Sequence, residues 1–220
     1  MTDSRYRKRL LFDDEVLEKY IIDQKNVDSE KNNFLDFQEY FGNVKYKRIE
    51  LEIGCGNGHF IHQKCYNNPE TFFIANEIKA TIIKKAALKI HKNNLQNAVF
   101  LRGDINYFIK YFGDASLDCV YINFPDPWPK TRHIKRRLIN LDFLKIIYEK
   151  IKFDGKIFFV SDSKNYIDYS IRHFKEFGKF KPGSENFGYK NEINDYPQSL
   201  FESLFRKKNI PIYYTFYIKK

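Results

Sequence analysis

The stretch that indicates the fold of this protein is LEIGCGNG, at residues 51–58. It closes a strand-like run over residues 48–53 and places three glycines at alternate positions, Gly54, Gly56 and Gly58. Such glycines let the backbone turn tightly and let a ligand approach where a Cβ atom would collide. A helical pattern begins at about His59. The stretch therefore predicts a strand, a ligand-binding turn and a helix.

Strand-like and helical patterns alternate after this stretch. Further strands are predicted at residues 72–75, 98–101, 117–123, 156–161 and 212–218, and further helices at residues 80–93 and 138–152. This alternation predicts an α/β fold, a Rossmann-like doubly wound sheet that is mostly parallel and has helices on both faces. A sheet of this kind binds ligands at the carboxyl ends of its strands.

The predicted domain organisation is one α/β domain over residues 48–220, preceded by an extension over residues 1–47. Helical patterns at residues 13–22 and 34–41 predict that the extension is helical. We expect it to be mobile in part and to lie on the substrate side of the domain.

Charge indicates the class of partner. The chain of 220 residues carries 38 Lys and Arg against 28 Asp and Glu, a net charge of +10, which favours a polyanion. No apolar stretch is long enough for a signal peptide or a membrane span, and the three cysteines form no Cys-x-x-Cys pair. Two of them, with His59 and His62, are too irregularly spaced for a zinc site, so no metal is expected. These features predict a cytoplasmic protein.

The basic residues cluster in one segment. Five cations occupy eight positions, with no acid between Pro127 and Leu141: Lys130, Arg132, Lys135, Arg136 and Arg137. A solvated surface normally mixes both signs of charge, so the run predicts contacts to phosphates, with a plain surface segment as the alternative.

Four carboxylates follow predicted strands, namely Glu52, Glu77, Asp104 and Asp126. Glu52 lies beside the glycine turn, where it would repel a pyrophosphate and attract a cationic amino acid or a sulfonium. His59 also breaks the Gly-x-Gly-x-x-Gly pattern of dinucleotide-binding proteins. Glu77 can accept both hydroxyls of a ribose, and Asp104 can accept from an adenine amino group. Each carboxylate alone could equally be a solvated side chain or a helix cap.

Residues 48–161 resemble the class I S-adenosylmethionine-dependent methyltransferases. The resemblance implies a seven-stranded sheet with an antiparallel last strand and S-adenosyl-L-methionine as cofactor, leaving S-adenosyl-L-homocysteine as product. It implies that Glu52 lies near the methionine end, Glu77 binds the ribose and Asp104 the adenine. The complete predicted cofactor set is Glu52, Gly54, Gly56, Gly58, Glu77, Asp104 and Asp126.

The most specific motif is NFPDPWPKTRHIKRR, at residues 123–137, where three prolines stiffen the chain and Trp128 offers a stacking face. It resembles the signature of the tRNA (guanine-N7)-methyltransferases. Ser161-Asp162 and the segment Ser199–Glu202 extend the match, although that family usually has threonine at both serine positions and a glycine-containing link where this chain has residues 206–209.

Residue by residue, this resemblance implies that Asp126 is catalytic. The substrate contacts that it implies are Lys130, Arg132, Lys135, Arg136, Arg137, Asp162, Ser199, Leu200, Phe201 and Glu202. The basic residues among them would contact tRNA.

The chemistry agrees with N7 as the target. Guanine N7 has an in-plane lone pair and no proton at neutral pH, so positioning and charge can replace a strong general base. An Asn-Pro-Pro-Tyr motif for amine methylation and a Pro-Cys nucleophile for carbon methylation are both missing from the sequence. The resemblance implies methylation of guanine-46 in the tRNA variable loop to 7-methylguanosine, and we expect a monomer or homodimer without an obligatory protein partner. The alternatives are another nucleic-acid methyltransferase, a non-catalytic RNA-binding protein and an NAD-linked dehydrogenase.

Overall fold

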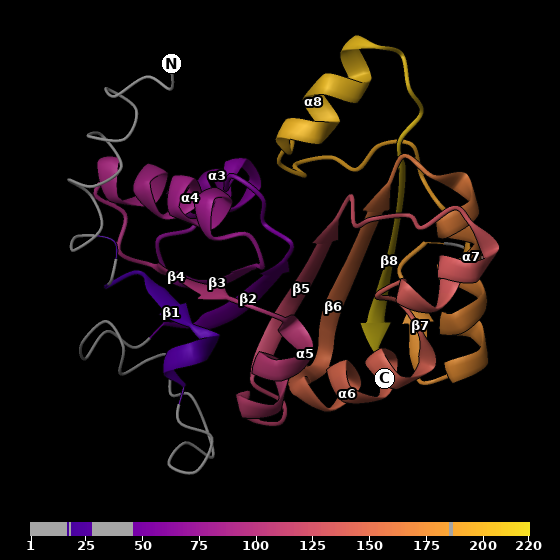
Figure 1. Cartoon of the computed structure of the whole chain (residues 1–220). Coiled ribbons are helices and arrows are strands. Elements are labelled where there is room, and N and C mark those ends of the chain that lie inside the picture. Colours follow the sequence, from indigo (N-terminus) through magenta and orange to yellow (C-terminus); the bar gives the residue numbers. More distant parts are fainter. Residues whose placement is uncertain (1–16, 18, 28–45, 185–186) are drawn as a thin grey trace.

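The computed structural model describes residue 17 and residues 19–27, 46–184 and 187–220. Eight strands of this part form one sheet, in the order β1-β4-β3-β2-β5-β6-β8-β7 (Figure 1). Their bounds are β1 Ile21–Asp23, β2 Arg48–Ile53, β3 Thr71–Glu77, β4 Ala98–Arg102, β5 Leu117–Asn123, β6 Ile151–Ser161, β7 Phe180–Pro182 and β8 Tyr213–Lys219. The pairs from β1 through β6 are parallel, whereas β8 is antiparallel to β6 and to β7.

Helices cover both faces of the sheet. Their bounds are α3 His59–Asn67, α4 Ala80–Lys92, α5 Ile105–Phe108, α6 Leu141–Lys150, α7 Lys164–Phe177 and α8 Leu200–Lys207, with the 3-10 helices η1 Gln24–Asn26, η3 Ile109–Tyr111 and η4 Thr131–Arg136. The predicted α/β fold with an antiparallel strand near the end of the chain is confirmed. The strand count differs, because eight strands are present where seven were expected.

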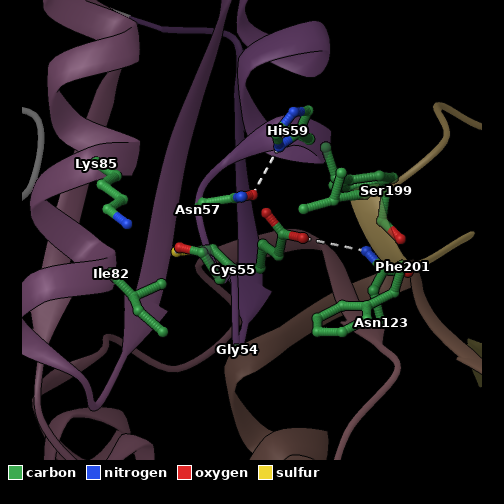
Figure 2. A pocket seen from close by; sticks show the side chains of 13 residues that line it. Gly54, Cys55, Asn57, His59, Ile82, Lys85, Asn123, Ser199 and Phe201 are labelled. Atoms are coloured by element: carbon green, nitrogen blue, oxygen red, sulfur yellow. Dashed lines mark hydrogen bonds between the residues drawn. The ribbon is translucent and has the colours of Figure 1, made fainter. Parts of the chain in front are cut away.

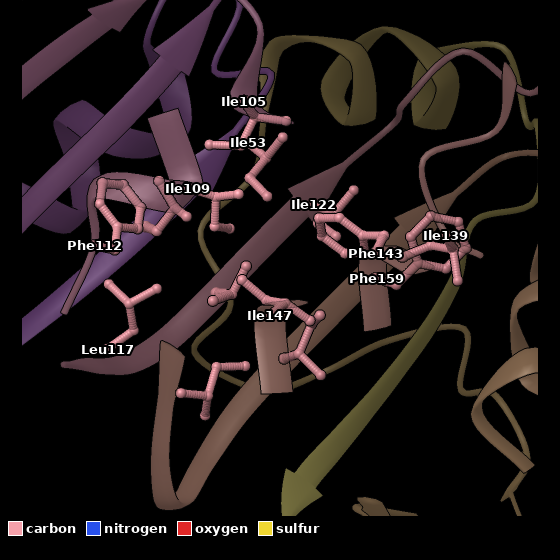
Figure 3. Packing of buried hydrophobic residues seen from close by; sticks show 14 of the residues in the cluster. Ile53, Ile105, Ile109, Phe112, Leu117, Ile122, Ile139, Phe143, Ile147 and Phe159 are labelled. Carbon is pink, nitrogen blue, oxygen red and sulfur yellow. The ribbon is translucent and has the colours of Figure 1, made fainter. Parts of the chain in front are cut away.

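The apolar core is divided by the alternation of side chains along the strands. Phe72 and Ile74 of β3 pack with α5, α6 and α7 in the larger cluster (Figure 3), whereas Phe73 and Ala75 pack on the opposite face with α3 and α4. Each such side chain, when fully buried, contributes about 1.5–3 kcal/mol. Both faces of the sheet are therefore covered by apolar contacts, so a polar ligand is expected at the ends of the strands.

The segment from α6 to β6 differs most from the sequence prediction. Helix α6 begins at Leu141 rather than 138 and ends at Lys150 rather than 152, and β6 begins at Ile151 rather than 156. The first part of β6 contains Asp154 at φ +59° and Gly155, and the pairing with β5 shifts between Leu117 and Cys119. This irregularity, together with the charged side chains in residues 152–156, hides the apolar alternation of the strand.

Strand β1 adds an edge to the sheet. It pairs with β4, and Arg102 forms an ion pair with Asp23. The predicted helix over residues 13–22 lies partly outside the described residues, and residues 21 and 22 belong to β1 instead. The predicted helix at residues 34–41 lies wholly outside them. Among the helices that the structure describes, none is long and apolar enough to cross a membrane.

Candidate active site

A cavity of about 200 Å³ lies at the carboxyl ends of β2 and β5, between the turn after β2, helix α4 and the start of α8 (Figure 2). Its lining residues are Glu52, Gly54, Cys55, Gly56, Asn57, His59, Phe60, Ile82, Lys85, Asn123, Ser199, Leu200 and Phe201. The cavity thus joins the predicted cofactor turn to part of the predicted substrate segment, although about 140 residues separate them in the chain.

The glycine turn has the conformation that its sequence requires. Gly54, Gly56 and Gly58 have φ angles of +75°, +54° and +75°, which strain any residue with a Cβ atom. A Cβ on Gly54 or Gly56 would meet no atom within 4 Å, whereas one on Gly58 would lie 2.7 Å from the Cβ of Ala86. The first two glycines therefore leave open space beside the turn, and the third permits the turn to pack against α4.

Glu52 is the buried charge of the site. It is 2% exposed, its Oε1 accepts a hydrogen bond from Asn123 Nδ2 at 3.2 Å, and its Oε2 has no partner among the described residues. Burial raises the pKa of Glu52 to about 8, although the hydrogen bonds from Asn123 and the backbone at Ile61 act in the opposite direction. A cation placed in the cavity would pair with this oxygen and favour the ionised carboxylate.

Glu77 and Asp104 also lie at strand ends, but neither lines the cavity. Glu77 accepts hydrogen bonds from the backbone N–H groups of Gly56 at 3.2 Å and Lys79 at 3.0 Å, so it holds the glycine turn against β3. Asp104 is exposed and caps α5, accepting from the Asn106 backbone at 2.9 Å. Both carboxylates thus have a structural task beside the predicted contact to a ligand.

Asp126 lies in the loop after β5. Its side chain is exposed and has no hydrogen-bond or ion-pair partner within the part of the chain that the structure describes. Phe124 and Trp128, two residues before and after it, have φ angles of +51° and +42°. Positive φ angles at bulky residues are strained and persist where the surrounding structure holds them. Asp126 does not line the cavity, so the structure leaves its predicted cofactor contact untested.

The basic segment divides into an exposed part and a buried residue. Lys130, Arg132, Lys135 and Arg136 are exposed, and the Arg136 guanidinium lies 5.1 Å from the centre of the Trp128 ring. These four side chains are available to phosphates.

Arg137 differs, because it is only 2% exposed. It donates hydrogen bonds to Pro127 O at 2.8 Å and to Asn165 Oδ1 at 2.7 Å, and its guanidinium lies over the rings of Tyr166 and Tyr169. The predicted contact of Arg137 with tRNA is at odds with this burial, and the residue instead joins the loop after β5 to α7.

Of the four predicted site residues at the start of α8, three line the cavity and one is buried outside it. Ser199 caps α8 by accepting from the Glu202 backbone at 3.1 Å, and Ser199, Leu200 and Phe201 line the cavity. The Phe201 ring is 53% exposed. Glu202 is buried, pairs with Arg206 at 2.9 Å and accepts from the Tyr214 hydroxyl. The predicted substrate contact of Glu202 conflicts with this burial, whereas Asp162 is partly buried and lies outside the cavity.

Several residues of the cavity were not assigned from the sequence. Asn123, the last residue of β5, binds Glu52, and His59 Nδ1 lies 2.6 Å from Asn57 Oδ1 (Figure 2). Lys89 of α4 also donates to the Asn57 carbonyl at 3.1 Å, which fastens the turn to that helix. A signal that could have indicated Asn123 is its position at the start of the NFPDP stretch, at the end of a predicted strand.

Solved structures confirm the fold. The 16S rRNA methyltransferase KamB matches with a TM-score of 0.62 at 11% identity, covering 85% of this chain and 94% of its own. A 30S ribosomal A1408 methyltransferase from an uncultured bacterium matches with a TM-score of 0.56 at 19% identity, covering 81% of this chain and 90% of its own.

Sequence comparisons are more specific. The family model described as "Putative methyltransferase" matches residues 46–215. The tRNA (guanine-N(7)-)-methyltransferase of Mycoplasma genitalium is 34% identical over 175 residues, which are 75% of this chain and 83% of the relative. That of Chlamydia felis is 33% identical over 185 residues, 84% of this chain and 80% of the relative. The fold, the cavity and these relatives together show that the chain belongs to the tRNA (guanine-N(7)-)-methyltransferase family.

Proposed function

We propose that this enzyme transfers the methyl group of S-adenosyl-L-methionine to N7 of guanine-46 in the variable loop of tRNA, forming 7-methylguanosine. Membership of the family supports the reaction and the substrate class. The observation that carries the cofactor assignment is the buried carboxylate of Glu52, with an unpartnered oxygen beside an open glycine turn. A buried carboxylate is costly when one of its oxygens has no partner, as Glu52 Oε2 has none among the described residues, and a cationic ligand would lower that cost.

The residues fit the methyl donor. When bound, S-adenosyl-L-methionine supplies a reactive methyl group on a sulfonium. Glu52 would hold the amino group of its methionine portion. Gly54 and Gly56, which have no Cβ atom, would let the ligand come close to the backbone of the turn. Glu77 and Asp104, at the ends of β3 and β4, would accept hydrogen bonds from ribose and adenine respectively. The dehydrogenase alternative is not supported, because Glu52 would repel a pyrophosphate in the same place.

Asp126 is proposed as the catalytic residue. Because guanine N7 is unprotonated at neutral pH, the protein needs to orient the base and stabilise positive charge rather than remove a proton. An exposed carboxylate that has no hydrogen-bond or ion-pair partner among the described residues can accept hydrogen bonds from the N–H edge of guanine and stabilise the cationic purine. The strained φ angles of Phe124 and Trp128, two residues before and after Asp126, support a loop conformation that is held for function.

The proposed tRNA surface consists of Lys130, Arg132, Lys135 and Arg136, with Asp162 and Ser199–Phe201 nearer to the base. Four exposed cations without an acid between Pro127 and Leu141 form the electrostatic footprint expected for a phosphate backbone. The exposed ring of Phe201, at the rim of the cavity, can stack on the target base. Arg137 and Glu202 are left out of this surface because both are buried.

An unmodified tRNA transcript, incubated with the purified protein and methyl-labelled S-adenosyl-L-methionine, tests the proposal. We expect label in 7-methylguanosine after nucleoside analysis, and none with a matched transcript carrying adenine at position 46. Label in 7-methylguanosine from both transcripts would contradict the position. Label in another nucleoside would contradict the proposed role of Asp126.

We also propose that the protein acts as a monomer or homodimer without an obligatory protein partner, in the cytoplasm where tRNA is available. Residues 21–23 of the predicted extension over residues 1–47 form strand β1 of the sheet, and the rest of that range is proposed to act on the substrate side of the domain. The molar mass of the purified protein, measured by light scattering with and without tRNA, tests the first statement. Turnover that appears only after adding a cell extract would contradict it.

A further inference from the structure

The segment before α8 reaches into the cofactor half of the site through one tyrosine. Tyr196 lies three residues before Ser199, and its ring packs against Phe60, Phe158 and Tyr214, with ring centres 5.1, 5.5 and 5.6 Å apart. Burial raises the pKa of the Tyr196 hydroxyl well above its usual value, so the group stays protonated and donates.

The Tyr196 hydroxyl sets the orientation of Asn123. It donates to Asn123 Oδ1 at 2.7 Å, and no other acceptor for it occurs among the described residues. An amide has an acceptor end and a donor end, so engaging Oδ1 turns Nδ2 the other way. Nδ2 then donates to Glu52 Oε1 at 3.2 Å. A chain of two hydrogen bonds therefore runs from the segment before α8 to the buried carboxylate.

The direction of these two hydrogen bonds affects whether Glu52 is ionised or protonated. A donor at Oε1 favours the ionised form, whereas an acceptor in its place would favour the protonated form. Other titratable or charged groups also face this site, namely Glu77 from β3, Cys55 and Cys65 from the turn and α3, and His59 and Lys85, which line the same cavity. Of the described side chains, only Asn123 donates to Glu52.

We propose that Tyr196 is a positioning residue for cofactor binding, whose hydroxyl fixes the Asn123 amide so that Nδ2 donates to Glu52 and stabilises the carboxylate that pairs with a bound cation. This inference rests on the proposed contact between Glu52 and the amino group of the cofactor. Without the hydroxyl, the Asn123 amide is free to turn its oxygen toward Glu52, which favours the protonated form further, so that a cation is bound more weakly.

The test compares Tyr196→Phe with the wild-type protein in binding S-adenosyl-L-homocysteine, measured by calorimetry between pH 6 and pH 9. We expect the variant to bind about threefold to tenfold more weakly near neutral pH, the range for loss of one hydrogen bond. The difference should shrink as the pH rises above the pKa of Glu52. Affinity for 5′-methylthioadenosine, which lacks the amino acid portion, should stay unchanged.

Two further variants separate the outcomes. Tyr189→Phe, which removes a hydroxyl from the exposed Tyr189 whose ring packs edge to face with Tyr213, serves as the matched control and should bind like the wild type. Asn123→Ala should shift the pH dependence in the same direction as Tyr196→Phe, and it replaces that variant should the latter not fold. Unchanged affinity in both variants, while Glu52→Gln weakens binding, would overturn the role of Tyr196 alone. Unchanged affinity in Glu52→Gln would instead overturn the proposed cofactor contact.

Discussion

The cofactor half of the site, at the ends of β2 and β3, and the substrate half, in residues 124–136, lie at the same edge of the sheet but differ in construction. In the cofactor half, Glu52 is buried and Glu77 is tied to the backbone of the glycine turn. In the substrate half, Asp126 and four cations are exposed. A rigid, buried site suits a small cofactor of fixed shape, whereas a large polyanion is bound by solvent-exposed charges.

This contrast predicts that changes in the cofactor half alter stability and its pH dependence. Changes in the exposed substrate half should alter turnover or RNA binding and leave stability unchanged. The four predictions that follow test this division.

Asp126→Asn should have the largest effect. It removes the proposed charge stabilisation, and we expect kcat to fall about a thousandfold, equivalent to ~4 kcal/mol in the barrier. The urea midpoint should not move, because Asp126 has no partner among the described residues. Single-turnover methylation of tRNA measures the first quantity, and a denaturant titration the second. Full turnover in the variant would remove Asp126 from the mechanism.

Glu52 should make the stability of the ligand-free protein depend on pH. Because burial raises its pKa to about 8 in the folded state, from about 4.5 when unfolded, the folded state holds the proton more tightly. Its stabilising contribution is complete below the unfolded pKa and is lost as the pH rises toward the folded pKa. We expect the free energy of unfolding to fall on the order of 3 kcal/mol from pH 5 to pH 8. Glu52→Gln should flatten this profile in urea titrations, and an equal slope in both proteins would contradict the assignment.

Buried Arg137 and the exposed residues Lys135 and Arg136, which belong to one motif, should respond differently to substitution. Arg137→Ala should lower the free energy of unfolding by about 2 kcal/mol, because two hydrogen bonds and two ring contacts are lost. Lys135→Ala and Arg136→Ala should leave stability unchanged, weaken tRNA binding and lower the slope of log affinity against log salt by about one unit or less each. Filter binding at several salt concentrations measures the slopes. A salt slope altered by Arg137→Ala as much as by the other two would show that the buried side chain reaches RNA.

Two glycines of the turn separate an effect on packing from an effect on ligand binding within the cofactor half. Gly54→Ala and Gly58→Ala both place a Cβ at positive φ, but only the second meets Ala86 at 2.7 Å. We expect Gly58→Ala to destabilise the protein by about 1 kcal/mol more than Gly54→Ala. Gly54→Ala should act mainly on affinity for S-adenosyl-L-homocysteine, because its new methyl group enters the open space beside the cavity. Thermal unfolding with and without this ligand separates the two effects, and equal stability of the two variants would contradict the packing argument.

Local patterns were sufficient where the physical signal is local. The strand-like patterns at residues 48–53 and 117–123 predicted the bounds of β2 and β5 residue by residue, since residue type and short-range spacing carry that signal. The start of β6 was missed because Asp154 and Gly155 interrupt that signal. In the same way, the sequence places Arg136 and Arg137 side by side in one basic run, and nothing local distinguishes the exposed side chain from the buried one.

The sequence by itself determined the α/β fold, the glycine turn with Glu52 beside it, and the exposed basic segment, because each depends on residue type and short-range spacing. Only the tertiary structure decided that Arg137 and Glu202 are buried. It also decided that Ser199–Phe201 close the cavity opposite the glycine turn and that Tyr196 reaches Glu52 through Asn123. These features depend on contacts between different elements of the fold, such as those of Asn123 with Glu52 and with Tyr196, 71 and 73 residues away in the chain, and such contacts exist only once the sheet has brought its strand ends together.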